Sequence, residues 1–543
     1  MSKVLEAAGI CKAYPAAGGE VTVLNNLNFY ANREEFVSFV GPSGCGKSTL
    51  FNIITGLLMP DSGSIVLKNR ETTGTPSPEL GYVLQKDLLF PWRTVMDNVI
   101  LGLEVRGTPK AEACDRARKL FELYHMQGYE KKFPSQLSGG MRQRVALMRT
   151  MVTNPEIILM DEAYKALDYP LKIALESELL GVVKEQHKTV IFITHDIEEA
   201  VTLSDRVYVM KARPGEIVQE IKVDLGVQSL SIPERRLSPR FNEYYEHIWR
   251  SIGTLPLIEK EEPMVMNTVS PRPAVASRSG RTSGEAVFRS ESARRYTLIV
   301  LQIAIVASLL GGWEWGARSG SINPFLFSSP SQVWEVLVAR FQSGEMLTDI
   351  GVTASETLIG FAVGAIGGSV LGLLLWYSRF ISDLAAPFIA AIGAIPVLAI
   401  APITIIWFGT EMLSKVVIVA FSCVVVSLTT SYKGALRTDP DLINLLRSFN
   451  ARRGTIFIKL VVPSAMLWVL SGLRLNVGFA LVGAIVGEYI SSDNGVGHMI
   501  LLGSSNFGMN IVLAGIVLVM LMMLCFNALV AFIERLILSW DRK

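Results

Sequence analysis

The sequence predicts two structural classes in one chain, an α/β domain followed by an all-α polytopic membrane domain of six helices. Three observations lead to this prediction. The composition changes sharply near residue 295, residues 1–255 alternate short β-rich runs with helical stretches, and long apolar runs follow. We therefore expect a soluble domain over 1–255, a flexible linker over 256–294 and a membrane domain over 295–543.

The overall composition supports a chain that is partly dissolved in lipid. Its 543 residues exceed what one core holds, half of them are hydrophobic, 18% are charged and the mean hydropathy is +0.37. Soluble proteins carry about 25% charged residues. The net charge of +2 gives no broad basic field, so we expect no nucleic-acid partner. The five cysteines form no CxxC pair, which argues against a disulfide framework or a structural zinc site.

Six apolar segments are long enough to cross a bilayer core of about 30 Å as helices. We place them near 297–316, 357–378, 386–408, 411–430, 464–487 and 510–537. Gly311–Glu314 mark the outer end of the first, and 317–355 should include an outside amphipathic helix. The alternative, that some of these segments are buried soluble helices, would need several such runs in one core.

Charge sets the expected orientation. Basic residues precede the first segment, follow the last and fill the loop between the fourth and fifth, whereas the loop 489–509 has no Lys or Arg. The positive-inside rule then places both termini in the cytoplasm of a bacterial-type inner membrane. The N-terminus also lacks the layout of a signal peptide, so the first domain should stay in the cytoplasm.

A phosphate-binding loop follows the first buried strand. It matches GxxxxGK[ST] and consists of Gly41, Pro42, Ser43, Gly44, Cys45, Gly46, Lys47 and Ser48, followed by Thr49. The glycines let backbone N–H groups surround phosphate oxygens, and the helix N-terminus favours negative charge. Lys47 would hold the β- and γ-phosphates and the Ser48 hydroxyl would bind Mg²⁺, which predicts a P-loop NTPase with ATP and Mg²⁺ as cofactors.

A second apolar strand, Ile157–Met160, ends in two carboxylates. Asp161 would reach Mg²⁺ at the strand edge, and Glu162 would act as general base on the attacking water. An isolated acidic pair of this kind more often solvates a turn. Beside a phosphate loop, the catalytic interpretation is favoured.

Leu137–Gln143, LSGGMRQ, resembles the signature motif of ATP-binding-cassette (ABC) ATPases. The resemblance implies that Ser138, Gly139 and Gly140 contact the γ-phosphate of ATP bound to an opposite subunit. Tyr14 resembles the aromatic residue that stacks on adenine. Gln85 resembles the glutamine that links Mg²⁺ to the membrane domain.

Two further segments follow the family's order. Asp168 in the ALD run resembles the D-loop aspartate, and His195 after TVIFIT resembles the switch histidine at γ-phosphate. A lone His after a strand is more often structural; its position on the ligand edge of an α/β sheet and the other motifs favour function. The family's DEPFGALD reads DEAYKALD here, with Ala163, Tyr164 and Lys165 in the changed positions. The expected catalytic residues are thus Lys47, Glu162 and His195, and the expected metal ligands are Ser48, Gln85 and Asp161.

The basic loop between the fourth and fifth spans resembles the coupling segment of binding-protein-dependent importers. Asn444, Leu445 and Leu446 occupy its EAA positions, Asn450 its Gly position and Pro463 its distal Pro, and only the Pro keeps its residue type. The following SGLRLNVGFALVGAIVGEYI and GVGHMI resemble permeases of the nitrate/sulfonate/taurine/bicarbonate group, which implies a type I importer-like membrane domain.

Arg474 lies inside the expected fifth span. An intramembrane charge suggests a solute contact, although a salt bridge or packing near the inner surface is the favoured interpretation.

The resemblance implies an ATP-driven importer of a small anionic or organic-acid solute. A second copy of the chain would complete each nucleotide site, either as a homodimer or with a similar half-transporter, and an extracytoplasmic binding protein would deliver the solute. An exporter half-transporter usually places its membrane domain first, unlike this chain. A non-transporting ATPase sensor of membrane state is the remaining alternative, and the sequence offers no sensor domain.

Overall fold

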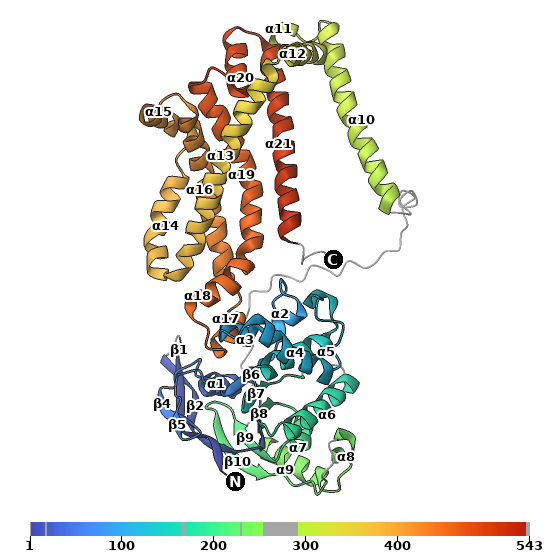
Figure 1. Cartoon of the computed structure of the whole chain (residues 1–543), viewed down its shortest axis with the longest axis vertical. Coiled ribbons are helices and arrows are strands. Elements are labelled where there is room, and N and C mark those ends of the chain that lie inside the picture. Colours follow the sequence, from blue (N-terminus) through green and yellow to red (C-terminus); the bar gives the residue numbers. More distant parts are fainter. Residues whose placement is uncertain (1, 17–18, 165–168, 228–230, 254–290, 539–543) are drawn as a thin grey trace. The chain divides into compact units, whose positions relative to one another are not determined.

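The computed structural model describes residues 2–16, 19–164, 169–227, 231–253 and 291–538 (Figure 1). The chain divides into two compact units. Unit 1 comprises Met1–Glu261, Thr438–Pro463 and Ser539–Lys543, and unit 2 comprises Glu262–Arg437 and Ser464–Leu538. Unit 1 is mixed α/β and unit 2 is helical, as the sequence predicts.

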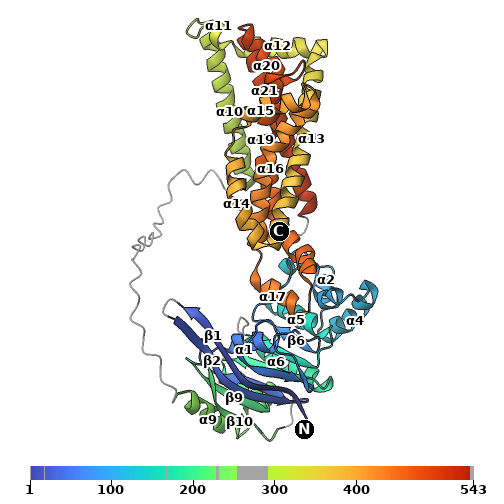
Figure 2. The same ribbon diagram turned by 90° about the vertical axis from the view of Figure 1, so that its left-hand side faces the viewer.

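Two sheets organise unit 1. The larger has the strand order β10-β9-β3-β8-β7-β6, with β10 antiparallel to β9 and the other pairs parallel. Its strands are β3 (Phe36–Val40), β6 (Leu80–Val83), β7 (Ile157–Asp161), β8 (Thr189–Thr194), β9 (Arg206–Lys211) and β10 (Glu216–Lys222). The smaller sheet is antiparallel, in the order β2-β1-β4-β5, and contains β1 (Lys3–Ala16), β2 (Gly19–Asn32), β4 (Ser62–Leu67) and β5 (Arg70–Glu71). Figure 2 shows β1 and β2 as a long pair.

The parallel strands are continuous apolar runs because their side chains alternate between two buried faces of the sheet. In β8, Val190 and Phe192 face one core cluster while Ile191 and Ile193 face another. Successive side chains of a strand point to opposite faces, so a strand covered on both faces must be apolar throughout. The predicted strands at Glu35–Val40, Ile157–Met160 and Thr189–Thr194 match β3, β7 and β8 to within one residue at either end.

Helices of unit 1 pack on the larger sheet and on one another. They are α1 (Lys47–Ile54), α2 (Val95–Val99), α3 (Leu101–Val105), α4 (Lys110–Leu123), α5 (Gly139–Met151), α6 (Tyr169–Glu185), α7 (Ile197–Leu203), α8 (Ile232–Arg236) and α9 (Phe241–Gly253). Side chains cap two of them at functional turns. The Ser138 hydroxyl accepts the Met141 amide at the start of α5, and the Asp196 carboxylate accepts the Glu198 amide at the start of α7.

Two short helices from the middle of the permease region belong to unit 1. They are α17 (Pro440–Ser448) and α18 (Arg453–Ile456), followed by a π-helical turn over Phe457–Val461. Asp439 caps α17 through the Asp441 amide, and Pro440 takes the first helical position. Asn450 has a φ of 65°, which is the left-handed conformation that the Gly position of the predicted coupling segment calls for.

Unit 2 contains long apolar helices. These are α10 (Glu291–Arg318), α13 (Glu345–Leu374), α16 (Met412–Leu436), α19 (Val462–Ile490) and α21 (Met509–Ile537). Shorter helices are α11 (Pro324–Phe327), α12 (Pro330–Ser343), α14 (Arg379–Gly393), α15 (Val397–Phe408) and α20 (Val496–Ser505). In the described part of the chain, five helices are long and apolar enough to cross a membrane, or six if the bent pair α14–α15 counts as one span.

Several predicted spans differ from the structure at their ends or in their course. The second, 357–378, begins earlier than predicted, because α13 starts at Glu345. The third, 386–408, is broken between α14 and α15 at an angle of 92°. Pro396 lacks the N–H that a continuous helix needs there, and it directly precedes α15. The first span does not end at Gly311–Glu314, because α10 continues to Arg318. Helix α12 lies in the 317–355 segment where a further helix was expected.

Close packing joins α13 and α16, which run side by side in Figures 1 and 2. Glycines recur every fourth residue along α13, at Gly360, Gly364, Gly368 and Gly372. A Cβ at any of them would overlap atoms of α16, such as Val419 Cβ at 2.5 Å from a Cβ at Gly360. Small residues at this spacing let two membrane helices approach backbone to backbone.

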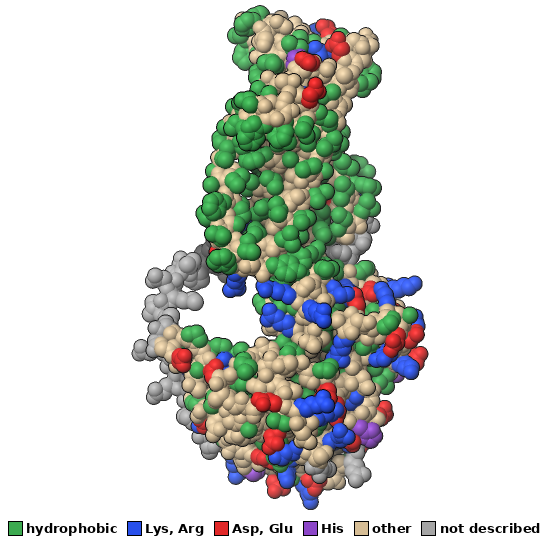
Figure 3. Space-filling model, turned by 60° about the vertical axis from the view of Figure 1, so that its left-hand side comes forward, with side chains coloured by type: hydrophobic (Ala, Val, Ile, Leu, Met, Phe, Trp, Pro, Cys, Tyr) green, Lys and Arg blue, Asp and Glu red, His purple; other side chains and the backbone are tan. Residues whose placement is uncertain are grey.

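Hydrophobic side chains also cover the face of unit 2 seen in Figure 3.

Candidate functional site

Parallel strands bring the predicted catalytic segments to one edge of the larger sheet. The phosphate loop follows β3, Gln85 follows β6, Glu162 follows β7 and His195 follows β8. The strand ends are in register, since Val40 pairs with Thr194 and Asp161 pairs with Ile193. Carboxyl ends of parallel strands form the ligand edge of an open α/β sheet. The edge therefore assembles a site from segments that are far apart in sequence. Val40 and His195, for example, are separated by 155 positions.

The phosphate loop has the geometry of an anion cradle. Gly44 and Gly46 have φ of 81° and 89°, and a Cβ at Gly46 would lie 2.5 Å from Leu24 Cδ2. Only glycine fits such a position without strain. Lys47 begins α1, is buried, and its ammonium donates to the Gly41 carbonyl at 2.7 Å and the Pro42 carbonyl at 3.0 Å. Backbone and ammonium donors thus gather at the N-terminus of one helix.

Cys45 is less reactive than its place in the loop suggests. The side chain is 1% exposed, and burial raises the pKa of its thiol although the neighbouring Lys47 ammonium opposes the shift. The thiolate is the reactive form, so low exposure and a raised pKa both disfavour oxidation or alkylation of Cys45. Ser43 and Ser48 are exposed and Thr49 is half-buried on the same loop and helix.

Three predicted site residues meet directly. Gln85 Nε2 donates to Glu162 Oε2 at 3.1 Å, and His195 Nδ1 lies 3.0 Å from Glu162 Oε1. Glu162 has a φ of 43°, a left-handed backbone that is strained for a residue with a Cβ. Its amide donates to the Ile193 carbonyl at 2.9 Å, which ties this turn to β8. The strained turn aims the carboxylate at the neighbouring strand end, where His195 lies.

The remaining nucleotide-contact candidates are dispersed. Asp161 is a buried carboxylate at the last position of β7. Tyr14 lies on β1 and is 38% exposed. Ser138 and Gly139 are exposed at the start of α5, with Gly140 buried behind them. Among the described residues, no hydrogen bond or ion pair joins them to Lys47, and their action across a dimer interface stays a prediction. Asp168 lies outside the described residues, as does Lys165.

The predicted coupling segment packs within unit 1. The Phe449 ring is 2% exposed and covers Gly102, where an added Cβ would lie 3.2 Å from Phe449 Cδ1. Leu445 and Leu446, at predicted EAA positions, are fully buried. Two ion pairs flank this packing: Lys86 with Asp441 at 3.1 Å, and Glu104 with Lys459. Glu104 also pairs with Arg93, so the second pair is part of a network.

Comparison with known proteins agrees with these features. Residues 24–165 match the family model described as ABC transporter, and residues 364–539 match that of a binding-protein-dependent transport system inner membrane component. An uncharacterized ABC transporter ATP-binding protein of Methanocaldococcus jannaschii is 44% identical over 248 residues, which are 46% of this chain and 91% of that protein. The chain belongs to the ABC transporter family.

Two further relatives carry import functions in their names. The taurine import ATP-binding protein of Roseobacter denitrificans is 40% identical over 43% of this chain and 88% of that protein. The aliphatic sulfonates import ATP-binding protein of Bacillus thuringiensis is 37% identical over 43% of this chain and 90% of that protein. This ABC transporter is accordingly an importer-type membrane protein in which a nucleotide-binding ATPase is fused to a permease domain, and ATP hydrolysis is coupled to transport.

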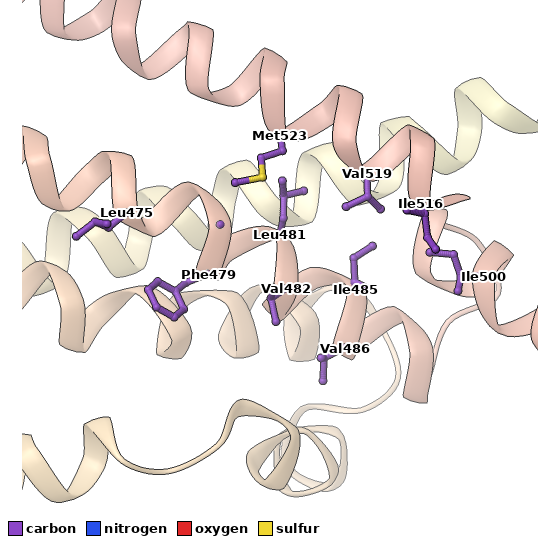
Figure 4. A pocket seen from close by; sticks show the side chains of 11 residues that line it. Leu475, Phe479, Leu481, Val482, Ile485, Val486, Ile500, Ile516, Val519 and Met523 are labelled. Atoms are coloured by element: carbon purple, nitrogen blue, oxygen red, sulfur yellow. The ribbon is translucent and has the colours of Figure 1, made fainter. Parts of the chain in front are cut away.

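Arg474 of the transporter forms an ion pair with Glu534 of α21, and its side chain is 56% exposed. The ion pair agrees with the favoured interpretation of this charge, a salt bridge, and a solute contact of Arg474 stays an untested prediction. A nearby cavity of about 560 Å³ begins at Leu475 and is lined by apolar side chains of α19, α20 and α21 (Figure 4). Its walls offer no partner for an anion, so this cavity does not match the predicted class of solute.

Sequence reasoning missed a polar cluster inside unit 2. Glu488 accepts the Thr353 hydroxyl and the Gly497 amide, both at 2.6 Å, and Asp349 accepts the Gly495 amide at 2.9 Å. Lys415 lies 3.5 Å from Glu356 and donates to Ser492 at 3.0 Å. These carboxylates are almost fully buried. The cluster fastens the segment 492–497 to α13 and α16. The sequence did contain a signal for this cluster, because ionisable residues within apolar membrane segments are rare and usually have a structural or functional role.

Proposed function

We propose that the chain is the core subunit of a binding-protein-dependent importer that moves a small anionic or organic-acid solute into the cytoplasm. One observation carries the proposal. The chain holds an ATPase and a permease, and α17 and α18 of the permease region pack within the same compact unit as the ATPase. A segment so placed can transmit nucleotide-driven movement to the membrane helices. The corresponding domains are 1–255, a linker over 256–294, and 295–543.

The nucleotide site would work through positioned donors and one base. Lys47 and the loop amides bind the β- and γ-phosphates, and Tyr14 stacks on adenine. Glu162 accepts a proton from the attacking water, and His195, in contact with Glu162, holds the water and the γ-phosphate in line. Ser138, Gly139 and Gly140 contact the γ-phosphate of a second copy, and Asp168 joins them at that interface. The functional unit is therefore a homodimer.

Mg²⁺ fits the donors present. Asp161 supplies a carboxylate, Ser48 a hydroxyl and Gln85 an amide, which are the oxygen donors that Mg²⁺ prefers. Because a carboxylate only accepts, the Gln85 nitrogen must face Glu162, and its amide oxygen is not used by that bond. When bound, Mg²⁺ neutralises charge on the phosphates. Gln85 would then contact both the metal and the general base.

The orientation follows from charge. With both termini and the basic α17–α18 segment in the cytoplasm, the ATPase meets cellular ATP, and the lysine-free loop 489–509 lies outside. The chain would reside in a bacterial-type inner membrane. An extracytoplasmic binding protein would dock on the outer side and deliver the solute.

The solute class rests on two supports. The relatives named above import taurine and aliphatic sulfonates, and the permease sequence resembles the nitrate/sulfonate/taurine/bicarbonate group. Both are analogies from relatives rather than from a site. We therefore name sulfonates, taurine and nitrate as the first solutes to test.

Proteoliposomes containing the full chain test the proposal. ATP hydrolysis and movement of labelled taurine, alkanesulfonates and nitrate are measured together, with the candidate binding protein present or omitted. An importer moves one of these solutes toward the ATPase side, and omission of the binding protein abolishes movement. Solute-stimulated hydrolysis without movement would instead show a sensor, and movement away from the ATPase side would show an exporter. Either outcome rejects import.

A further inference from the structure

Lys172 lies among three carboxylates beside the catalytic edge. Its ammonium is 2.7 Å from Asp196 Oδ2, 2.6 Å from Glu199 Oε1 and 4.0 Å from Glu176 Oε1. The side chain is 15% exposed. Lys172 sits in the first turn of α6, which begins at Tyr169, directly after the predicted D-loop. No sequence motif singled it out.

Two of these carboxylates build the turn that carries His195. Asp196 follows His195 in the chain and caps α7 by accepting the Glu198 amide at 2.9 Å. Glu199 accepts the hydroxyl of Thr194, the residue before His195. The Thr194 hydroxyl in turn accepts the Asp196 amide at 2.9 Å. Both neighbours of His195 are therefore fixed by groups that Lys172 contacts.

Electrostatics favour the charged forms of Lys172 and Asp196. Burial by itself would raise the pKa of Asp196, but hydrogen bonds from Lys172 and from two amides of α7 hold it below its ordinary value. Burial likewise opposes the charge of Lys172, and its bonds to Asp196 and Glu199 more than offset that effect and raise its pKa. A half-buried ammonium shared between two carboxylates is a stronger tie than an exposed pair.

The geometry connects this tie to the general base. Lys172, Asp196, His195 and Glu162 line one cavity of about 230 Å³. His195 Nδ1 is 3.0 Å from Glu162 Oε1, and the His195 side chain is 47% exposed. An exposed imidazole depends on its backbone turn for its position. Lys172 supplies direct ion pairs from α6 to Asp196 and Glu199 of this turn.

We propose that Lys172 is a positioning residue for ATP hydrolysis, holding the His195 turn so that the imidazole stays in contact with Glu162. It joins the start of α6, next to the D-loop, to the segment bearing His195. The D-loop is expected to face a second copy of the chain. The ion pairs of Lys172 would then couple the conformation of that interface to the position of His195. This inference rests on the proposed role of His195 at the γ-phosphate.

The test compares variants of the full chain in liposomes. Lys172→Met removes the ammonium and keeps an unbranched side chain, while Lys172→Arg keeps the charge. Lys188→Met is the matched control, because Lys188 is 8% exposed, donates to Asn154 at 2.6 Å and lies at the opposite end of β8. For each variant, kcat and KM for ATP hydrolysis and the affinity for ATP are measured, with thermal unfolding alongside.

We expect Lys172→Met to lower kcat about tenfold or more, since small displacements of catalytic groups have effects up to about 10²-fold. The KM and the affinity for ATP should change less than about twofold, since the phosphate loop is untouched. Lys172→Arg should recover most of the kcat, and Lys188→Met should behave as wild type. Asp196→Asn weakens the same tie from its other end. Combined with Lys172→Met, it should add little further loss.

Two results would overturn the inference. In the first, Lys172→Met keeps the wild-type kcat while His195→Ala is inactive. The histidine is then essential, but Lys172 does not hold it in place. A kcat in Lys172→Arg as low as in Lys172→Met shows that a retained cation does not support the His195 turn, which contradicts the role assigned to the charge. Full activity of His195→Ala is a separate failure, because it rejects the proposed role of the histidine itself. If Lys172→Met does not accumulate, Asp196→Asn and Lys172→Arg decide the question by the same kcat criterion.

Discussion

Glu176 on α6 is a carboxylate with no exposed surface. Its oxygens lie 4.0 Å from the Lys172 ammonium and 3.8 Å from the Arg236 guanidinium, distances at the outer limit of an ion pair. Burial, reinforced by the nearby Glu199 carboxylate, raises the pKa of Glu176 to about 7. The two cations oppose this shift without cancelling it.

A raised folded-state pKa makes this group a source of pH-dependent stability. The native state holds the proton more tightly than the unfolded chain, so the stabilisation is complete below about pH 4.3 and falls as pH rises to about 7. Glu176→Gln should therefore raise the unfolding temperature of the full chain in detergent at pH 8 and change it little near pH 5. Glu122→Gln, an exposed change of the same kind, is the control. A lower unfolding temperature for Glu176→Gln at pH 8 would contradict this account.

Individual site residues differ in how far sequence alone could place them. Glu162 and His195 follow apolar strands, and strand ends in a parallel sheet meet at one edge, so their proximity was predictable. The left-handed backbone of Glu162 was not, because it depends on the bond from its amide to β8. The contacts of Lys172 could not be predicted for the same reason. Its partners Asp196 and Glu199 lie 24 and 27 residues away in sequence, and no spacing rule relates them to it.

At the scale of elements, α17 is held within unit 1 mainly by packing. Phe449 fills the space over Gly102, whereas the Lys86–Asp441 pair is largely exposed and contributes little to stability. Phe449→Ala should remove about 3–5 kcal/mol of packing and lower transport per ATP hydrolysed, while hydrolysis itself persists. The measurement is the ratio of solute moved to phosphate released.

Two controls accompany this variant. Phe449→Leu keeps most of the buried volume and should keep most of the ratio. Asp441→Asn removes only the exposed pair and should leave it unchanged. A normal ratio in Phe449→Ala would show that this packing does not couple the two activities.

The polar cluster of unit 2 makes a second element-scale prediction. Lys415→Met leaves Glu356 buried without its cation, a change worth about 3–5 kcal/mol, and should sharply lower the unfolding temperature in detergent. Arg474→Gln breaks a pair whose arginine is 56% exposed and should have a much smaller effect. Equal unfolding temperatures for the two variants would mean that the cluster does not hold α13 to α16.

The predicted spans reveal why element ends were missed. The second predicted span starts at residue 357, directly after Glu356. The fifth ends at residue 487, directly before Glu488. The helices continue through both, because the charges are paired inside the unit. Hydropathy alone ends a span at a charge, since it contains no information about partners. The break at Pro396 was a local signal that the overall apolar run concealed.

For the whole molecule, composition was enough to predict an α/β ATPase followed by a helical membrane domain. It could not assign residues 438–463, which belong to the permease region in sequence and to unit 1 in space. That assignment depends on tertiary contacts of Leu445, Leu446 and Phe449. The four motifs of the sheet edge were strong because each follows a strand, while the solute site has no such signature and remains a proposal by analogy.

The central claim is that hydrolysis at Glu162 drives solute import. Its most direct test is the accumulation of the transported solute in cells that contain equal membrane amounts of the wild-type chain or Glu162→Gln, with the affinity for ATP measured on both. Loss of a general base should lower hydrolysis about 10²–10⁴-fold and leave ATP binding intact. The account predicts accumulation by the wild type and none by Glu162→Gln. Accumulation that persists in Glu162→Gln would contradict it.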